Sequence, residues 1–348
     1  MKLKAPVPMK LIGPIKLVGD QLDDEVNVPM ATFESTLWPS TNRGAKVSRA
    51  AGGIHVAIVD ERMTRSIALR ALNAEHALQV LKQLNRQQEE MAKLVEQTSR
   101  YCKLLNLHSQ IVGNMLYLRF EYSTGDAAGH NMVTLASECL QQRILEIFPD
   151  LEYVSLSGNY CVDKKVSSVN AILGRGKYVV AEVTIPKGVC EKILKTTPEK
   201  IADLCVKKNL LGSVIAGSTH SANAHFANLL LATYLATGQD AANIVEGSQG
   251  ITFAEVRNGD LYFSVTLPNI IVGTVGHGKD LEFVKENLSV MGCLEERPVG
   301  DNARRLAMII AATVLCGELS LMAALTDPHE LMRAHKTFER RATESVSS

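Results

Sequence analysis

The feature that most constrains the fold is a run of twenty mostly apolar residues, LAMIIAATVLCGELSLMAAL, at Leu306–Leu325. A helix of that length spans about 30 Å, enough to cross a bilayer or the middle of a large domain. Gly317, Glu318 and Ser320 interrupt the run, and a carboxylate inside a membrane span is costly. We therefore predict a helix buried at the centre of a large folded domain.

The composition argues against several classes of protein. Lysine and arginine together number 37, as do aspartate and glutamate, so the chain lacks the basic excess of a general nucleic-acid binder. The seven cysteines form no C-x-x-C pair, which argues against a zinc site and fits a reducing compartment. The first residues carry no signal-peptide core. We predict a soluble, cytoplasmic protein with no metal site and no membrane anchor.

The first half of the chain divides into two kinds of pattern. Residues up to about Asp60 carry turn formers and β-branched residues, which predict loops and short strands, with a strand at 54–60. From Ile67 to Ser155 the order is helix, strand pair, helix and strand, with Gly113-Asn114 as the turn of the pair. Such a unit packs its helices on one face of an antiparallel sheet. Its helices are expected at 71–95 and 129–148, its paired strands within 110–125, and its last strand at 151–158.

The second half also mixes strands and helices, so the predicted fold class is α+β. The clearest strand is 178–186, and a second at 260–276 ends in glycines. A helix is expected over 221–240 with Ser221 as its N-cap, and a last helix from about His329 to Arg341.

A charge cluster stands out in SGNYCVDKK, at 157–165. Asp163, Lys164 and Lys165 follow a polar bend at the end of a strand, which is where sites concentrate. A solvated loop is the plain interpretation. The functional interpretation is that a lysine among other cations loses proton affinity and stabilises a developing oxyanion.

Three further side chains have both a structural and a chemical interpretation. Glu34 is either an exposed strand carboxylate or a proton donor whose pKa is raised by burial. Asp240 follows an apolar helix, where it meets the negative end of the dipole unless a cation lies nearby. His335 is either an exposed side chain or an acid that works near neutral pH.

Two glycine-rich segments are candidates for contact with phosphate. LGRGK at 173–177 and GTVGHGK at 273–279 match neither the Rossmann nor the P-loop spacing, so each is also compatible with an ordinary turn. A nucleotide would therefore be bound outside a Rossmann domain.

Taken together, the motifs resemble the catalytic domain of the 3-hydroxy-3-methylglutaryl-coenzyme A reductase family, most closely its class I form. The resemblance runs from about Pro8 to Arg340. In chain order the motifs are VPMATFES, STNRG, MTR, SGNYC, DKK, GRGK, KNLLGS, NAHFAN, GQDAAN, LPNI, VGTVG and GELSLMAAL.

The resemblance implies a fold and a reaction. A large domain around the long helix, expected at 1–66 and 156–348, would bind substrate and coenzyme A. A small inserted ferredoxin-like domain at 67–155 would bind NADPH, with NADH as the alternative. The reaction is the four-electron reduction of hydroxymethylglutaryl-coenzyme A to mevalonate. The enzyme would be a homodimer or a dimer-based oligomer, with active sites between subunits.

The family's catalytic residues fall on Glu34, Lys164, Asp240 and His335. Lys164 would stabilise the oxyanion, Asp240 would position that lysine, His335 would protonate the departing thiolate, and Glu34 would donate or relay the proton that forms the final alcohol. The substrate-binding positions are Arg65, Ser157, Asp163, Lys165, Lys208, His225 and Asn228. The coenzyme A positions are Ser40, Asn42, Arg43 and Lys46. The cofactor positions are Ser99, Arg100, Asp126, Gly129, Asn131, Met132, Gly174, Arg175, Gly176, Lys177 and Arg340.

The chain departs from the family pattern in several places. The family usually carries methionines where Ala128 and His130 stand, and KTFERR follows His335 in place of MIHNRS. Arg341 replaces a serine used for phosphorylation control in animals, and the chain begins after the family's Glu-Asn-Val-Ile-Gly segment. Two other functions stay open: NAD-dependent mevalonate oxidation, and binding without catalysis on the same fold.

Overall fold

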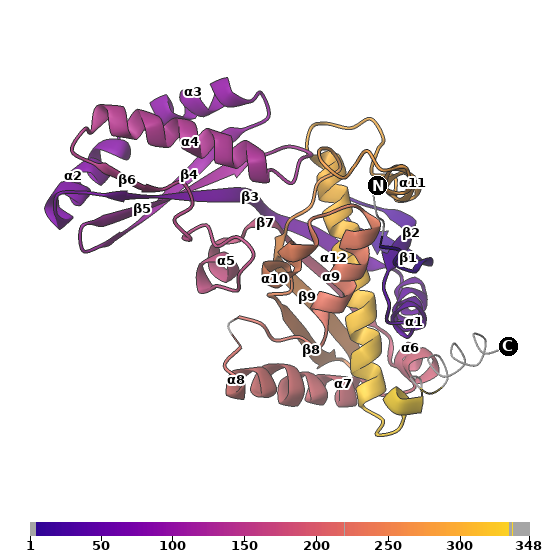
Figure 1. Cartoon of the computed structure of the whole chain (residues 1–348). Helices are drawn as coiled ribbons and strands as arrows, with labels where there is room; N and C mark the ends of the chain where they lie inside the picture. Colours follow the sequence, from indigo (N-terminus) through magenta and orange to yellow (C-terminus); the bar gives the residue numbers. More distant parts are fainter. Residues whose placement is uncertain (1–4, 219, 334–335, 337–348) are drawn as a thin grey trace.

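The computed structural model describes residues 5–218, 220–333 and 336, and it has the predicted α+β architecture. Its main sheet has the strand order β2-β1-β3-β7-β9-β8 and lies against the long helix α12 (Figure 1). Among the described strand pairs only β1 and β3 run parallel, so this is not the parallel sheet of a Rossmann domain. The strands are β1 (Met9–Val18), β2 (Asp24–Ala31), β3 (Ile54–Arg70), β7 (Gly176–Ile185), β8 (Ile251–Arg257) and β9 (Asp260–Ile270).

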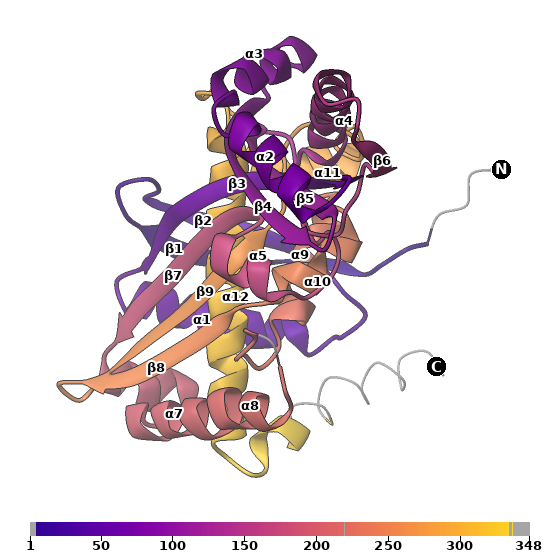
Figure 2. The ribbon, with the colours of Figure 1, turned by 90° about the vertical axis from the view of Figure 1, so that its left-hand side faces the viewer.

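Strand β3 belongs to two sheets. Its first half pairs with β7 in the main sheet, and residues 63–70 pair with β5 in a smaller antiparallel sheet. Figure 2 shows this strand running from one body of the protein into the other. The predicted strand at 54–60 is therefore too short. The charged residues that seemed to end it have partners, because Arg62 donates to Glu121 at 2.6 Å.

The smaller sheet carries its helices on one face, as predicted, and has its own hydrophobic core. The turn at Gly113-Asn114 is confirmed, since Val112 pairs with Met115 across it. The single helix predicted at 71–95 is wrong: two helices meet at residues 85–87, and their apolar periodicity hides the break. The elements are α2 (Ala74–Leu84), α3 (Gln88–Thr98), β4 (Lys103–Val112), β5 (Met115–Ser123), α4 (His130–Ile147) and β6 (Glu152–Ser155).

Helix α12 (Asp301–Leu325) is the predicted central helix. By length and composition it is long enough to span a membrane, but 94% of its most apolar window is buried inside the protein. Its neighbours approach very closely. A Cβ at Gly44 of helix α1 (residues 37–50) would lie 2.1 Å from the Cys316 carbonyl oxygen, and one at Gly317 would lie 2.2 Å from Leu229 of helix α9 (residues 226–236). The prediction of a buried core helix is confirmed.

Helix α1 (Leu37–Ala50) was not predicted, because Pro39, Gly44 and several turn formers lie within it. Pro39 is the third residue of the helix, where the missing N–H has no intrahelical partner in any case. Gly44 is required by contact with α12. Position in the helix explains Pro39 and tertiary packing explains Gly44, and local helix propensity accounts for neither.

Helix α9 (Phe226–Ala236) is shorter than predicted and does not begin at Ser221. Its start is capped from α12, where the buried carboxylate of Glu318 accepts hydrogen bonds from the N–H groups of Ala224 and His225 at 2.6 and 3.0 Å. The remaining helices are α5 (Ser168–Leu173), α6 (Lys187–Val189), η1 (Cys190–Leu194), α7 (Pro198–Leu204), η2 (Cys205–Gly212), α8 (Ser213–Ile215), η3 (Ala241–Asn243), α10 (Ile244–Gly247) and α11 (Glu282–Val290).

Candidate active site

The cluster at 157–165 holds an ion pair. The Lys164 Nζ atom lies 2.8 Å from Asp240 Oδ2, and both side chains are about two-fifths exposed, at 41% and 42%. The hydrogen bond to Asp240 raises the pKa of Lys164. Partial burial would raise the pKa of Asp240, but hydrogen bonds from Lys164 and from the Ala242 N–H lower it overall. Lys164 is thus the cation that Asp240 needs beyond the end of α9, and both groups stay charged through the neutral range.

A second set of predicted residues gathers at the start of α9. Asn228 Nδ2 donates to Glu34 Oε2 at 3.0 Å, beside a cavity of about 460 Å³. Arg43 donates to the Ser320 backbone and hydroxyl oxygens and pairs with Glu330. Residues lining this cavity include Glu34, Leu37, Ser40, Arg43, His225, Asn228, Leu321 and Leu331.

Helix α9 separates these two sets within one chain. Asn228 lies in its first turn, and Asp240 lies beyond its last residue, Ala236. The helix between Asn228 and Ala236 is about 12 Å long at 1.5 Å per residue. Glu34 and Lys164 are therefore held at opposite ends of α9.

The predicted cofactor positions Asp126 and Gly129 lie in a loop, residues 124–129, that ends at the N-terminus of α4. Gly129 has a φ of 93°, and the first turn of α4 lacks a side-chain cap. The Asp126 carboxylate accepts hydrogen bonds from the N–H groups of Gly300 and Ala303, so it caps α12. A cavity of about 410 Å³ adjoins the loop and is lined by Glu61, Arg100, Tyr101, Lys103, Ser123, Gly125, Val299 and Arg304.

The GRGK segment is turned into the protein. Arg175 and Lys177 are buried, and a Cβ at Gly176 would lie 2.4 Å from the Ile270 carbonyl oxygen. Arg175 lies 2.8 Å from Glu246 and 3.0 Å from Asp163, and Lys177 Nζ donates to the Val272 carbonyl at 3.5 Å. Both cations thus have partners inside the protein, and their contact with a nucleotide stays a prediction.

Several of the other predicted positions have local partners. Arg65 donates to the Ser157 hydroxyl at 3.4 Å, and Lys165 Nζ donates to the Asp163 carbonyl at 3.1 Å. Lys208 Nζ donates to the Asn209 side chain at 3.4 Å, and the Asn42 side chain accepts from the Gly13 N–H. Lys46 is exposed on α1, the Ser99 hydroxyl accepts from the Tyr101 N–H, and Asn131 and Met132 follow His130 in α4. His335 and Arg340 lie outside the described residues.

Two residues of this site were not predicted. Glu246 is fully buried and accepts a hydrogen bond from the Lys164 N–H at 3.1 Å. His130 begins α4, with Nε2 at 4.0 Å from Asp163 Oδ1, and burial followed by the charge of Arg175 lowers its pKa. The substitution of a family methionine by histidine was the signal for His130. Glu246 is a lone acid in an apolar segment and gave none.

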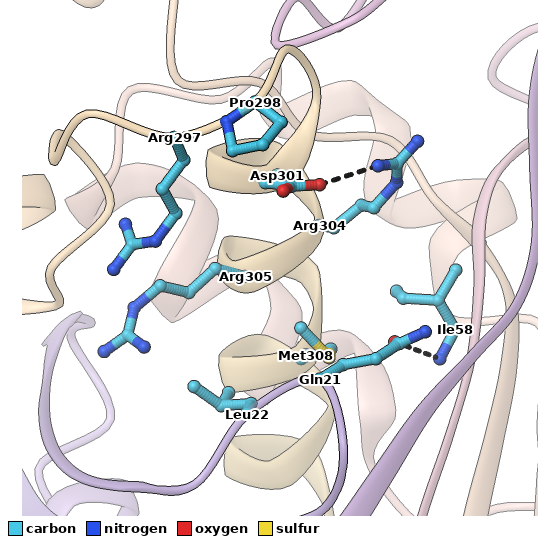
Figure 3. A pocket seen from close by; sticks show the side chains of 9 residues that line it. All are labelled: Gln21, Leu22, Ile58, Arg297, Pro298, Asp301, Arg304, Arg305 and Met308. Carbon is cyan, nitrogen blue, oxygen red and sulfur yellow. Dashed lines mark hydrogen bonds and ion pairs between the residues drawn. The ribbon is translucent and has the colours of Figure 1, made fainter.

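A separate cavity of about 420 Å³ lies at the start of α12 (Figure 3). Three arginines line it, and each one is paired with a carboxylate. Arg297 pairs with Glu295, Arg304 with Asp301 and Glu61, and Arg305 with Asp24. Its positive charge is therefore balanced locally.

Known proteins share both the sequence and the fold. A 3-hydroxy-3-methylglutaryl-coenzyme A reductase of Pyrococcus abyssi is 50% identical over 96% of this chain and 82% of its own length. One from Strongylocentrotus purpuratus is 43% identical over 98% of this chain and 37% of its own length. The solved class II 3-hydroxy-3-methylglutaryl-CoA reductase from Streptococcus pneumoniae, bound to NADPH, covers 93% of this chain and 86% of its own. Its TM-score is 0.73 and its identity is 20%, so it supports the fold alone.

These similarities identify the chain as a member of an oxidoreductase family. Residues 4–340 match the model of the family described as Hydroxymethylglutaryl-coenzyme A reductase. The chain belongs to this family, and the resemblance of its motifs is confirmed.

Proposed function

We propose that this protein reduces hydroxymethylglutaryl-coenzyme A to mevalonate and coenzyme A, using two NADPH. The observation that carries the proposal is the ion pair of Lys164 with Asp240, at 2.8 Å in a part-exposed loop. A thioester carbonyl gains negative charge on its oxygen when hydride attacks its carbon. A fixed ammonium group lowers the energy of that oxyanion, and Asp240 keeps the ammonium in place.

The residues then act in sequence on the substrate. NADPH, when bound, supplies one hydride in each of two steps. Lys164 stabilises the first oxyanion, which collapses to an aldehyde as the carbon–sulfur bond breaks. His335 gives its proton to the coenzyme A thiolate, so the thiol does not add back. Glu34 gives a proton to the alkoxide formed in the second reduction, and mevalonate leaves.

The residues near the α4 N-terminus suit a dinucleotide phosphate. Anions bind at helix N-termini because the free N–H groups and the dipole both favour negative charge. The adjoining cavity places Arg100 and Lys103 near Gly125, where a 2′-phosphate would meet two cations. We assign the residues at 67–155 to this nucleotide-binding unit and the rest of the chain to the substrate.

We also propose that two copies of the chain complete each site. Glu34 and Lys164 lie at opposite ends of α9, which supports a site that takes Glu34 from one subunit and Lys164 from the other. An apolar surface suited to such a partner covers η2, α8 and β8, where Ile215 is 88% exposed. Its members are Leu210, Leu211, Val214, Ile215 and Phe253. The free cysteines of the described chain fit a cytoplasmic location.

The reaction is tested by mixing the purified dimer with hydroxymethylglutaryl-coenzyme A and NADPH. Absorbance at ~340 nm, the usual nicotinamide band, should fall as NADPH is oxidised. About two NADPH should be consumed for each thioester reduced, while mevalonate and free thiol appear. Protein that oxidises neither NADPH nor NADH would contradict the proposal. Arg100→Ala should raise the KM for NADPH by about tenfold or more and leave the KM for NADH unchanged, because NADH lacks the 2′-phosphate.

The shared site is tested by mixing two inactive variants, Glu34→Ala and Lys164→Met, and letting their subunits exchange. In a mixed dimer one site would carry both defects and the other neither, so random exchange should restore about a quarter of wild-type activity. If Glu34 and Lys164 act within one chain, every mixed site carries a defect and no activity returns.

A further inference from the structure

We propose that Glu246, with Arg175, is a positioning residue that fixes the main chain of Lys164. This inference rests on the proposed reductase function and adds a role for two buried residues outside the substrate cavity. Asp240 holds the ammonium end of Lys164, and Glu246 holds its peptide N–H, so the lysine is fixed at both ends.

The Glu246 carboxylate is the centre of a buried network. Its Oε1 atom accepts from the Lys164 N–H at 3.1 Å, from Arg175 NH1 at 2.8 Å and from Asn243 Nδ2 at 2.8 Å. Glu246 and Arg175 are both fully buried. Asn243 and Glu246 lie in η3 and α10, directly after Asp240, so one short segment supplies the anchors at both ends of the lysine.

Lys164 needs such an anchor because its backbone is strained. Its φ is 56°, in the left-handed region, and Val162 in the same loop has a φ of 48°. This conformation is unfavourable for a residue that carries a Cβ, because the Cβ comes too close to the following carbonyl oxygen. The conformation persists only where surrounding contacts determine it, and the Glu246 hydrogen bond is such a contact.

Arg175 closes the network on the other side of Lys164. Its NH2 atom lies 3.0 Å from Asp163 Oδ1, while its NH1 atom holds Glu246. The guanidinium therefore ties the residue before Lys164 to the carboxylate that binds the Lys164 N–H. Arg175 was expected to contact the nucleotide from the resemblance, but its buried contacts give it this positioning role.

The test compares two double variants that remove the buried charges together. Arg175→Met with Glu246→Gln keeps an oxygen that accepts from the Lys164 N–H. Arg175→Met with Glu246→Met keeps a similar volume but has no acceptor. Replacing both partners avoids the large cost of leaving one buried charge unpaired. Both variants lose the Arg175–Asp163 contact equally, and they differ in whether the Lys164 N–H and the Asn243 side chain keep their acceptor.

We expect the double variant with Glu246→Met to have a kcat at least about tenfold below that of the control with Glu246→Gln, because the oxyanion-stabilising group is misplaced. Its alkaline limb in the pH profile of kcat should move to lower pH, since Lys164 loses its fixed position beside Asp240. The dimer and the KM for NADPH should agree between the two.

Equal kcat values and equal pH profiles in the two variants would overturn the inference. A rise in the KM for NADPH in both variants would indicate that Arg175 contacts the nucleotide, and it would also count against the inference. Wild-type protein without activity would instead contradict the proposed function, so the two failures are distinguishable.

Discussion

The loop at 157–165 and the segment at 174–177 contain the same kinds of residue and use them in opposite ways. Both combine glycine with lysine; Lys164 lies in a turn, and Lys177 is the second residue of β7. The Lys164 side chain is 41% exposed and its pKa is raised by the hydrogen bond to Asp240. Lys177 is 5% exposed and burial lowers its pKa. Burial, which a motif does not encode, decides whether a cation meets substrate or holds the fold.

The sharpest way to test that difference is the same substitution at both lysines. Lys164→Met should lower kcat by about 10³-fold, because it removes the group that stabilises the oxyanion. It should change the free energy of unfolding by less than about 1 kcal/mol, since the pair with Asp240 is exposed. Steady-state kinetics and urea unfolding measure the two effects. Retained activity would remove Lys164 from its role.

A smaller effect is expected from the partner of that lysine. Asp240→Asn should lower kcat by about 10²-fold, because the ammonium remains but loses its fixed position. In the wild type the raised pKa of Lys164 keeps it charged through neutral pH. The variant should lose that support, so the alkaline limb of its pH profile should lie at lower pH. A profile of kcat from about pH 6 to about pH 10, set beside that of the wild type, would show the shift. An unmoved limb would contradict the pairing.

The smallest effect is expected at the buried lysine. Lys177→Met should leave kcat within about twofold and change the free energy of unfolding by about 1 kcal/mol or less, with stabilisation favoured. The sign of the pH dependence follows from the pKa of Lys177, which burial lowers in the folded state. Between that lowered pKa and the free value of about 10.4, unfolded wild type binds more protons than folded wild type. Wild type should gain stability relative to the variant as pH rises through that window. A loss of wild-type stability relative to the variant over this pH range would contradict the burial of the Lys177 ammonium group.

The sequence predicted best those parts of the fold that depend on local pattern. The hairpin at Gly113-Asn114, helix α4 and the burial of α12 follow from turn chemistry and apolar periodicity. Helix α1 was missed because its proline is tolerated in the first turn of the helix and its glycine is required by the close approach of Cys316. The capping of α9 by Glu318 was missed for the same kind of reason, since its partner lies far along the chain.

The candidate site shows the same limit. Motif resemblance named Lys164, Asp240, Glu34 and Asn228, and the structure pairs them as two couples. The resemblance could not show that Arg175 is buried or that Glu246 binds the Lys164 N–H, because both facts depend on contacts between residues far apart in the sequence. Burial and partner choice follow from tertiary packing, which a motif leaves unspecified.

Strand β3 has a consequence for how the protein unfolds. A single strand of 17 residues contributes to the hydrogen-bond ladders of both sheets, and Ile271, directly after β9 of the main sheet, packs in the core of the smaller one. Loss of order in one sheet therefore removes pairing partners from the other. Calorimetry should record one melting transition for both cores, in place of the two independent transitions that separately folding bodies would give.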